Sequence, residues 1–154
     1  ARLSMPIDMS ILKGKEAFTF GSGKKEMYLF TDTQCPYCKK FEAFFPQIED
    51  KVKIHIYFFP LSRHLEAFDL SMYIMSKPTL KEKIETFLTT SKDDKGFINR
   101  KISKDKEKEL AAKITEHLKI GEEIGVQGTP TLLDKDGNKI NWGEMLQDFG
   151  IQLK

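Results

Sequence analysis

The chain has 154 residues, the length of one domain, and at this size folding should bury roughly two-thirds of the unfolded surface. Its 25 basic and 23 acidic residues nearly cancel, and the lysines are spread along the whole chain. This composition indicates neither nucleic-acid binding nor membrane insertion, because the chain has no basic block and no apolar run close to the roughly 18 residues of a membrane span. A domain of this size needs no disulfide to hold its core together, so its two cysteines are free for chemistry.

The first part of the chain predicts a βαβ unit. Residues 16–20 alternate as a short strand, and the apolar run at 26–31 predicts a buried strand. Apolar residues at three-and-four spacing predict an amphipathic helix over 36–48, and period-two alternation predicts a strand over 52–59. The end of the buried strand therefore lies at the carboxyl edge of an open α/β sheet, where ligands bind.

Cys35 and Cys38, separated by two residues, lie at this corner. Cys35 falls at the N-terminus of the predicted helix, where unpaired N–H groups, the helix dipole and the nearby charges of Lys39 and Lys40 stabilise a thiolate. Pro36 suits the first helical position because its missing N–H would have no partner there. Cys38 lies one turn further on the apolar face and should point inward. We therefore expect Cys35 to be the attacking thiol and Cys38 the resolving thiol of a redox-active pair.

Two other roles fit the cysteine pair less well. A structural zinc site needs four ligands, and the scattered histidines, His55, His64 and His117, do not complete one. A structural disulfide would close a very short loop and add little stability. The histidines are expected to be structural or solvated, with His64 the one best placed to approach the pair. The sequence predicts no metal and no other cofactor.

The rest of the chain predicts helices and then a return to the sheet. Helical spacing runs from residue 63 to 124, with Pro78 between two helices and a solvated loop or weak helix start at 91–108, and it ends at Gly125. An apolar strand follows Thr129-Pro130. A hairpin turn at 136–137 then leads to a last strand at 139–141, which is expected to complete the sheet, and a final helix begins near residue 142.

These motifs together resemble a known family. The segments are Phe30-Thr31-Asp32 before Cys35-Pro36-Tyr37-Cys38-Lys39, Phe59-Pro60, and Gly125-Val126 with Gly128-Thr129-Pro130. Over about residues 26–149 they look like the thioredoxin-fold catalytic domain of the bacterial DsbC and DsbG disulfide interchange proteins. The resemblance implies an α/β thioredoxin-like fold, with a central mixed sheet flanked by helices and a helical insertion at about 63–124, between the βαβ unit and the hairpin. Residues 1–25 are then an N-terminal segment with a short strand, and residues 26–154 the catalytic domain.

The resemblance also implies roles for residues outside the cysteine pair. In this family the proline is cis and faces the dithiol, and the threonine before it modulates the redox site, so these roles fall to Pro130 and Thr129. Tyr37 should line the opening and bind substrate together with them. The edge of the strand after Pro130 would let an unfolded substrate add alongside by main-chain hydrogen bonds.

One feature of thioredoxins is missing at its usual place. Thioredoxins carry an acidic residue six positions before the nucleophile, where it assists proton transfer to and from the buried thiol. Leu29 occupies that position here. Asp32 and Glu42 are close in sequence, but the general behaviour of acidic residues places both on the surface.

The function predicted from these features is a periplasmic thiol:disulfide oxidoreductase of DsbC/DsbG type, its direction left open between oxidation, reduction and isomerisation. Its expected partners are unfolded or misoxidised protein substrates and a membrane redox partner that recycles the dithiol. The chain starts at Ala1-Arg2-Leu3, so we expect a signal peptide to have been removed. Two alternatives remain: a cytosolic glutaredoxin-like reductase, disfavoured by the long helical insertion, and a non-catalytic chaperone with the same fold.

Overall fold

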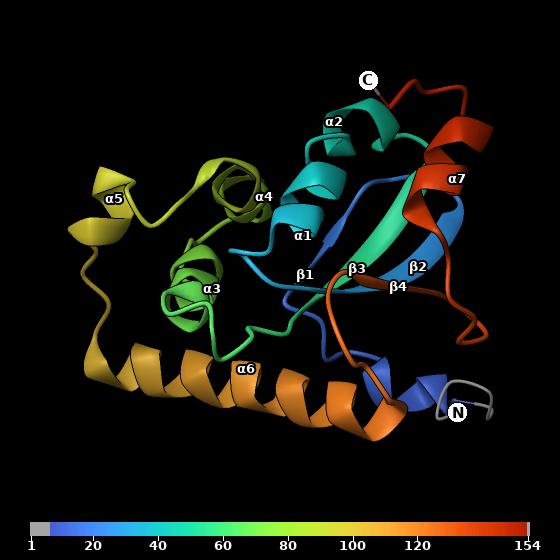
Figure 1. Cartoon of the computed structure of the whole chain (residues 1–154). Helices are drawn as coiled ribbons and strands as arrows, with labels where there is room; N and C mark the ends of the chain where they lie inside the picture. The colour runs from blue at the N-terminus through green and yellow to red at the C-terminus, as the bar shows by residue number, and fades with distance from the viewer. Residues whose placement is uncertain (1–6, 154) are drawn as a thin grey trace.

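A four-stranded mixed sheet forms the centre of the computed structural model, which describes residues 7–153. Its strands are β1 (Phe18–Phe20), β2 (Lys25–Thr31), β3 (Val52–Phe58) and β4 (Thr131–Asp134), in the order β1-β3-β2-β4 (Figure 1). β2 and β3 are parallel, as the βαβ prediction requires, and both edge strands are antiparallel to their neighbours. The expected start of the mature chain at Ala1 lies outside the described residues.

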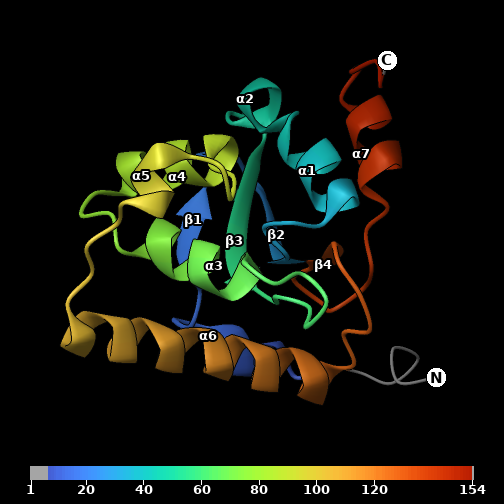
Figure 2. The ribbon, with the colours of Figure 1, turned by 60° about the vertical axis from the view of Figure 1, so that its left-hand side comes forward.

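Helices cover both faces of this sheet (Figures 1 and 2). On one side lies α6 (Lys104–Ile124), with the short 3-10 helix η2 (Met9–Leu12) near its C-terminal end. On the other side lie α1 (Pro36–Glu42), α2 (Phe45–Ile48) and α7 (Trp142–Asp148). The helices α3 (Ala67–Met75), α4 (Leu80–Thr89) and α5 (Lys95–Ile98) precede α6 in the chain, so α3 to α6 form the predicted helical insertion.

The helix expected over residues 36–48 is broken into α1 and α2. Pro46 explains the break, because it has no N–H to donate and its ring would clash with the carbonyl of residue 42 in a continuous helix. Phe44 N–H instead donates to Phe41 O at 3.0 Å, the tight turn of a helix end. The helix that follows Cys35 is therefore a separate element of two turns.

Residues 91–108, for which a solvated loop or a weak helix start was expected, contain the short α5 and the beginning of α6 at Lys104. Ser103 caps α6 by accepting a hydrogen bond from Lys106 N–H at 3.2 Å, and acidic residues lie in its first turn, where they suit the helix dipole. These first residues are exposed, so the apolar periodicity that signals a helix is absent from them.

The predicted last strand at 139–141 is not formed. A single bridge joins Lys139 to Leu133, and the chain then enters α7, which Asn141 caps. Too few residues separate the turn from this cap for a strand to extend. Ile140 N–H still donates to Leu132 O at 2.8 Å, so part of the outer edge of β4 is already occupied.

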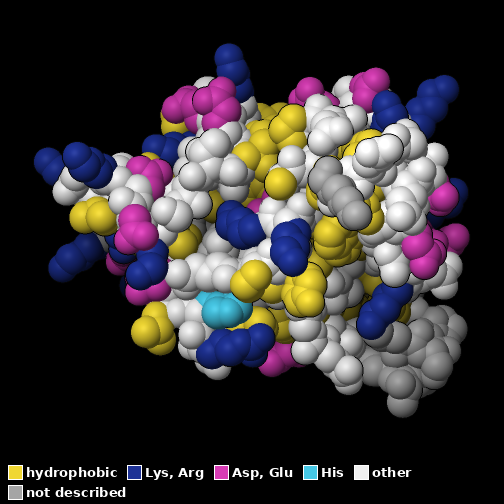
Figure 3. All heavy atoms as spheres, turned by 45° about the horizontal axis from the view of Figure 1, so that its top comes forward, with side chains coloured by type: hydrophobic (Ala, Val, Ile, Leu, Met, Phe, Trp, Pro, Cys, Tyr) yellow, Lys and Arg dark blue, Asp and Glu magenta, His cyan; other side chains and the backbone are white. Residues whose placement is uncertain are grey.

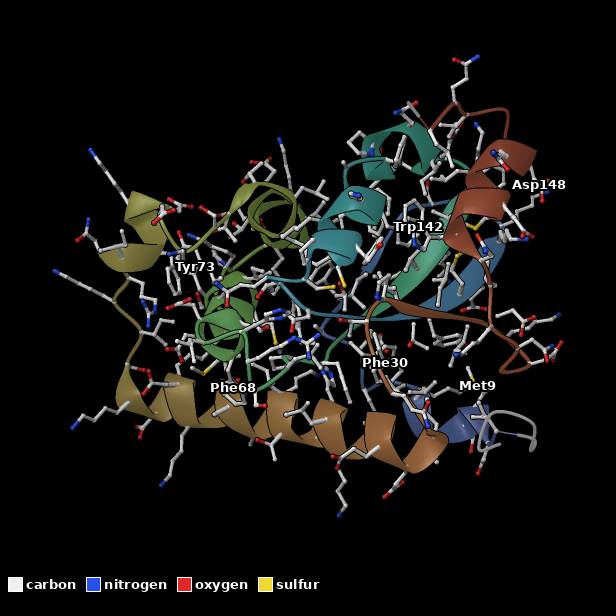
Figure 4. The ribbon with its side chains drawn as sticks, in the orientation of Figure 1. Met9, Phe30, Phe68, Tyr73, Trp142 and Asp148 are labelled. Atoms are coloured by element: carbon white, nitrogen blue, oxygen red, sulfur yellow. The ribbon has the colours of Figure 1, made fainter. Side chains whose placement is uncertain are left out.

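Two apolar clusters hold these layers together, one on each face of the sheet. Under α1 and α7, the ring of Phe41 stacks on Trp142 with centroids 5.2 Å apart. Between the sheet and α6, Phe30 stacks on Tyr57 at 5.0 Å, and Figure 4 shows Phe30 on the side that faces α6. Gly121 permits this close approach, because a Cβ there would come within 2.6 Å of the Phe59 ring.

Candidate functional site

The cysteine pair lies where β2 ends and α1 begins. Cys35 is the N-cap of α1 with extended backbone, and Pro36 occupies the first turn, as predicted. Cys35 N–H donates to Asp32 O at 3.1 Å, which closes the turn between strand and helix. The local sequence therefore places Cys35 at the positive end of the helix and turns Cys38 toward the sheet.

The two thiols are free and differ in their surroundings. Cys35 retains 6% exposure, and its sulfur lies 3.5 Å from the carbonyl oxygen of Thr129, whose peptide bond with Pro130 is cis. Cys38 is fully buried, and its sulfur accepts a hydrogen bond from Asp32 N–H at 3.5 Å. A partner reaching the site thus meets the sulfur of Cys35 first.

Burial also separates Cys38 chemically from an ordinary thiol. Loss of hydration raises the pKa of Cys38 to about 12, while the hydrogen bond from Asp32 N–H and the nearby polar side chains of Thr31 and Thr129 act to lower it. The neighbouring Cys35 raises it further. Because only the thiolate attacks a disulfide, Cys38 needs a base close by if it is to react at neutral pH.

The residues predicted around the pair lie at its rim and beneath it. Tyr37 is 64% exposed in the first turn of α1, with Lys40 Nζ 5.2 Å from the centre of its ring. The hydroxyl of Thr129 is buried and makes no hydrogen bond of standard geometry within residues 7–153, although it lowers the pKa of Cys38. Figure 3, with the top of Figure 1 turned toward the viewer, shows hydrophobic surface interrupted by lysine or arginine side chains.

Asp32 and Glu42 contradict the expectation that they lie on the surface. Asp32 is fully buried and Glu42 is 2% exposed. Glu42 follows Cys38 by four residues, and residues at that spacing share one face of a helix. The spacing that turned Cys38 inward could therefore have predicted the burial of Glu42.

The carboxylate of Asp32 ties the active-site turn to the loop after β3. It accepts hydrogen bonds from Gln34 N–H, from Leu61 N–H and from His64 Nδ1, each at 2.7 Å. His64 therefore reaches the site through Asp32. Through these contacts Asp32 holds the turn that precedes Cys35 against the loop after β3.

The other two histidines lie away from the cysteine pair. His55 is hydrogen-bonded to Thr19 and Glu26, both at 2.7 Å, on the sheet. His117 is fully buried between α6 and β3. Both have structural contacts, as expected.

Within 7–153, no three His, Cys, Asp or Glu side chains come together in a way that could hold a metal ion. In the same range, no helix combines the length and the apolar character needed to cross a membrane.

Comparison with known proteins identifies the family. Residues 19–147 match the model of the thioredoxin-like domain family, so the chain belongs to that family. The predicted α/β thioredoxin-like fold with its helical insertion is thereby confirmed. No curated protein matches the chain by sequence.

Solved bacterial structures share the fold at low sequence identity. The thiol-disulfide exchange protein alpha-DsbA2 from Wolbachia pipientis superposes with a TM-score of 0.67 at 14% identity, over 92% of this chain and 89% of that one. The catalytic domain of Proteus mirabilis ScsC gives 0.61 at 20% identity, over 95% and 94%. A periplasmic thioredoxin-like protein from Salmonella enterica serovar Typhimurium gives 0.58 at 21% identity, over 90% and 91%.

Proposed function

We propose that the protein is a thiol:disulfide oxidoreductase that exchanges disulfides with protein substrates through Cys35 and Cys38. The observation that carries this proposal is the position of Cys35, which caps α1 with its sulfur 3.5 Å from the Thr129 carbonyl beside Pro130. A thiol at a helix N-terminus with a second thiol one turn below it is the arrangement that disulfide exchange needs. The similar Wolbachia protein is described as a thiol-disulfide exchange protein, which supports the same chemistry here.

The unequal surroundings of the two sulfurs support unequal roles for them. Cys35 attacks a substrate disulfide and forms a mixed disulfide, and Cys38, which is shielded from solvent, then attacks Cys35 and releases the reduced substrate. Run backwards, the same steps oxidise a substrate dithiol. The substrate main chain lies along Thr129 and Pro130, which precede β4. Further along, at Leu132, the edge of β4 is already hydrogen-bonded to Ile140 N–H. Tyr37 contacts the substrate at the rim of the site.

The compartment and partners belong to the same proposal. We place the protein in the periplasm, where disulfides persist, and the similarity to a periplasmic thioredoxin-like protein of Salmonella supports this. Unfolded or misoxidised proteins are the proposed substrates, and a membrane redox partner recycles the dithiol.

Assignment to the DsbC/DsbG branch rests on the sequence motifs alone, chiefly the cysteine motif with Pro36-Tyr37 and the later Thr129-Pro130. The fold similarity to alpha-DsbA2 and ScsC favours a broader placement among disulfide exchange proteins. Refolding of a scrambled multi-disulfide protein separates an isomerase from a simple oxidant, because only an isomerase recovers native pairing from a fully oxidised start.

The central test measures insulin reduction by the wild type, Cys35→Ala and Cys38→Ala. We expect Cys35→Ala to lose the activity. Cys38→Ala should accumulate a mixed disulfide with insulin, visible by non-reducing electrophoresis and mass spectrometry, since the resolving thiol is gone. Equal insulin reduction by the wild type and Cys35→Ala would refute the proposal.

A further inference from the structure

A buried carboxylate lies under the dithiol, on the inner face of α1. Glu42 is 2% exposed, and its Oε2 accepts a hydrogen bond of 2.7 Å from the Thr31 hydroxyl at the end of β2. Its Oε1 has an ion-pair contact with Lys39 Nζ at 3.3 Å but no hydrogen bond within the described residues. A buried charge that is only partly satisfied is costly to fold around, so its presence calls for an explanation.

This carboxylate changes its charge near neutral pH. Burial raises the pKa of Glu42 to about 7, against the positive charge of Lys39 and the hydrogen bond from Thr31, while the charge of Asp32 raises it further. Lys39 on the same helix and Asp32 after β2 are the charged groups that face it. Glu42 can therefore take up and give back a proton under the conditions in which disulfide exchange proceeds.

Thr31 connects this group to the resolving thiol. Its hydroxyl donates to Glu42 at 2.7 Å, and the neighbouring Asp32 N–H donates to Cys38, so the end of β2 lies against both groups. The Thr31 side chain also lowers the pKa of Cys38 against the larger effect of burial. One hydroxyl proton cannot be donated in both directions at once. The pair of contacts thus describes a hydroxyl that donates to Glu42 while Cys38 is a thiol, and turns toward Cys38 when it is a thiolate.

We propose, on the premise of the disulfide exchange proposed above, that Glu42 accepts the proton of Cys38 through the Thr31 hydroxyl when Cys38 resolves the mixed disulfide. The Cys38 proton passes to Thr31 Oγ1 as the Thr31 hydroxyl proton passes to Glu42 Oε2. This leaves a neutral carboxylic acid and a Cys38 thiolate.

The electron pair of that thiolate forms the Cys35–Cys38 bond. The bond between Cys35 and the substrate sulfur breaks, and the substrate leaves as a thiolate with its electron pair and then takes a proton from water. The cysteine pair is oxidised by two electrons and the substrate disulfide is reduced. In the reverse direction Glu42 returns the proton to Cys38.

Asp32 is the competing candidate, and its contacts argue against it. Both of its carboxylate oxygens already accept hydrogen bonds of 2.7 Å, from Gln34 N–H on one side and from Leu61 N–H and His64 on the other. Asp32 contacts Cys38 through its main-chain N–H, which donates a hydrogen bond and cannot accept a proton. Glu42 thus supplies the carboxylate that thioredoxins carry at the position of Leu29, and it approaches the thiol from α1 instead of from β2.

The test is a stopped-flow reaction of the reduced protein with an aromatic disulfide whose thiolate product absorbs visible light. Attack by Cys35 releases a first equivalent of this product, and resolution by Cys38 releases a second. In the wild type the second phase should quicken with pH and level off above about pH 7, where Glu42 is ionised. In Glu42→Gln it should slow by about 100-fold at pH 7, the usual contribution of a general base, and keep rising with pH.

Variants of the bridging hydroxyl provide an independent arm. Thr31→Val should slow the second phase as Glu42→Gln does, whereas Thr31→Ser, which restores the hydroxyl, should recover it. Glu26→Gln is the matched control, because it makes the same change on β2 beside His55, and it should behave as the wild type. If Glu42→Gln does not fold, as judged by circular dichroism, the Thr31 pair decides.

The results separate the two proposals. If the second phase in Glu42→Gln and Thr31→Val has the wild-type rate and still levels off with pH, the role of Glu42 is refuted. Disulfide exchange through Cys35 and Cys38 is not affected by that result. A first phase that survives in Cys35→Ala overturns the proposed function itself.

Discussion

Two buried titratable groups lie on opposite faces of the sheet and differ in their hydrogen bonds and in their pKa values. Glu42 lies on the face covered by α1, and His117 comes from α6 on the other face. Both side chains are removed from solvent. Their hydrogen bonds distinguish a buried group that supports the structure from one that is available for chemistry.

His117 uses both of its ring nitrogens. Nδ1 accepts a hydrogen bond of 3.0 Å from Phe58 N–H, and Nε2 donates one of 2.6 Å to Lys15 O. Burial lowers the pKa of His117 to about 4, so the ring is neutral at pH 7. It joins α6 to β3 and to the segment before β1, with no capacity left for another partner.

Glu42 is the opposite case. One of its oxygens has no hydrogen bond within residues 7–153, and burial moves its pKa toward neutrality rather than away from it. A satisfied group held in one protonation state stabilises a fold, whereas an incompletely satisfied group that titrates near pH 7 is suited to proton transfer.

Replacing His117 should have the largest effect on stability. His117→Leu keeps most of the side-chain volume but leaves Phe58 N–H and Lys15 C=O unpaired in the interior, so we expect a loss of about 3 kcal/mol in the free energy of unfolding at pH 7. Urea unfolding followed by circular dichroism measures it. Thr115→Ala, on the exposed side of the same helix, is the control and should change stability by less than about 0.5 kcal/mol.

The same variant has a defined dependence on pH. The pKa of His117 in the folded protein, about 4, lies below its ordinary value of 6.5, so the unfolded chain binds more protons between these values. Stability from the neutral imidazole is complete above pH 6.5 and is lost as the pH falls toward 4. The gap between the wild type and His117→Leu should therefore narrow over this range. A gap that stayed constant would show that the ring is not held neutral by the fold.

Glu42→Gln should move stability in the other direction. The folded pKa of Glu42, about 7, lies above its ordinary 4.5, so ionisation destabilises the fold as the pH rises from 4.5 through 7. Relative to the wild type, the variant should gain about 2 kcal/mol between pH 5 and pH 8, as expected for a shift of this size. Urea unfolding at the two pH values measures this. No relative gain would mean that Glu42 is satisfied in the way His117 is.

Much of the fold could be predicted from the sequence, because it depends on local patterns. An apolar run identified β2, alternation identified β3, and the spacing of apolar residues identified the helices of the insertion. The structure differs from the periodicity where a local feature such as a proline or a helix cap decides the backbone. Pro46 divides the active-site helix, Ser103 starts α6 on exposed residues, and the cap at Asn141 ends the predicted strand.

The site was predictable to a lesser depth. The positions of Cys35 and Cys38 follow from their place between strand and helix, but the burial of Asp32 and Glu42 contradicted residue-type statistics. Statistics for acidic residues describe the average carboxylate, and a site that needs a buried one departs from that average. The contact between Thr31 and Glu42 joins a strand end to a helix face, and only the packed structure brings these two together.

Replacing Lys39 should have the smallest effect on stability, because it changes mainly the pKa of Glu42. Its ammonium group, 3.3 Å from Glu42 Oε1, is the strongest influence that opposes the rise in the pKa of Glu42. Lys39→Met should therefore raise that pKa above about 7. The pH at which the resolving phase levels off should rise with it. Stability at pH 5, where Glu42 is protonated and forms no ion pair with Lys39, should change by less than about 1 kcal/mol.

Lys40→Met is the matched control for this prediction. It removes the same charge one residue further along α1, where the ammonium group lies 5.2 Å from the centre of the Tyr37 ring rather than beside Glu42. If the two variants levelled off at the same pH, the charge around the helix as a whole, and not its contact with Glu42, would govern the resolving step. A shift confined to Lys39→Met would localise the control of that step to the buried carboxylate.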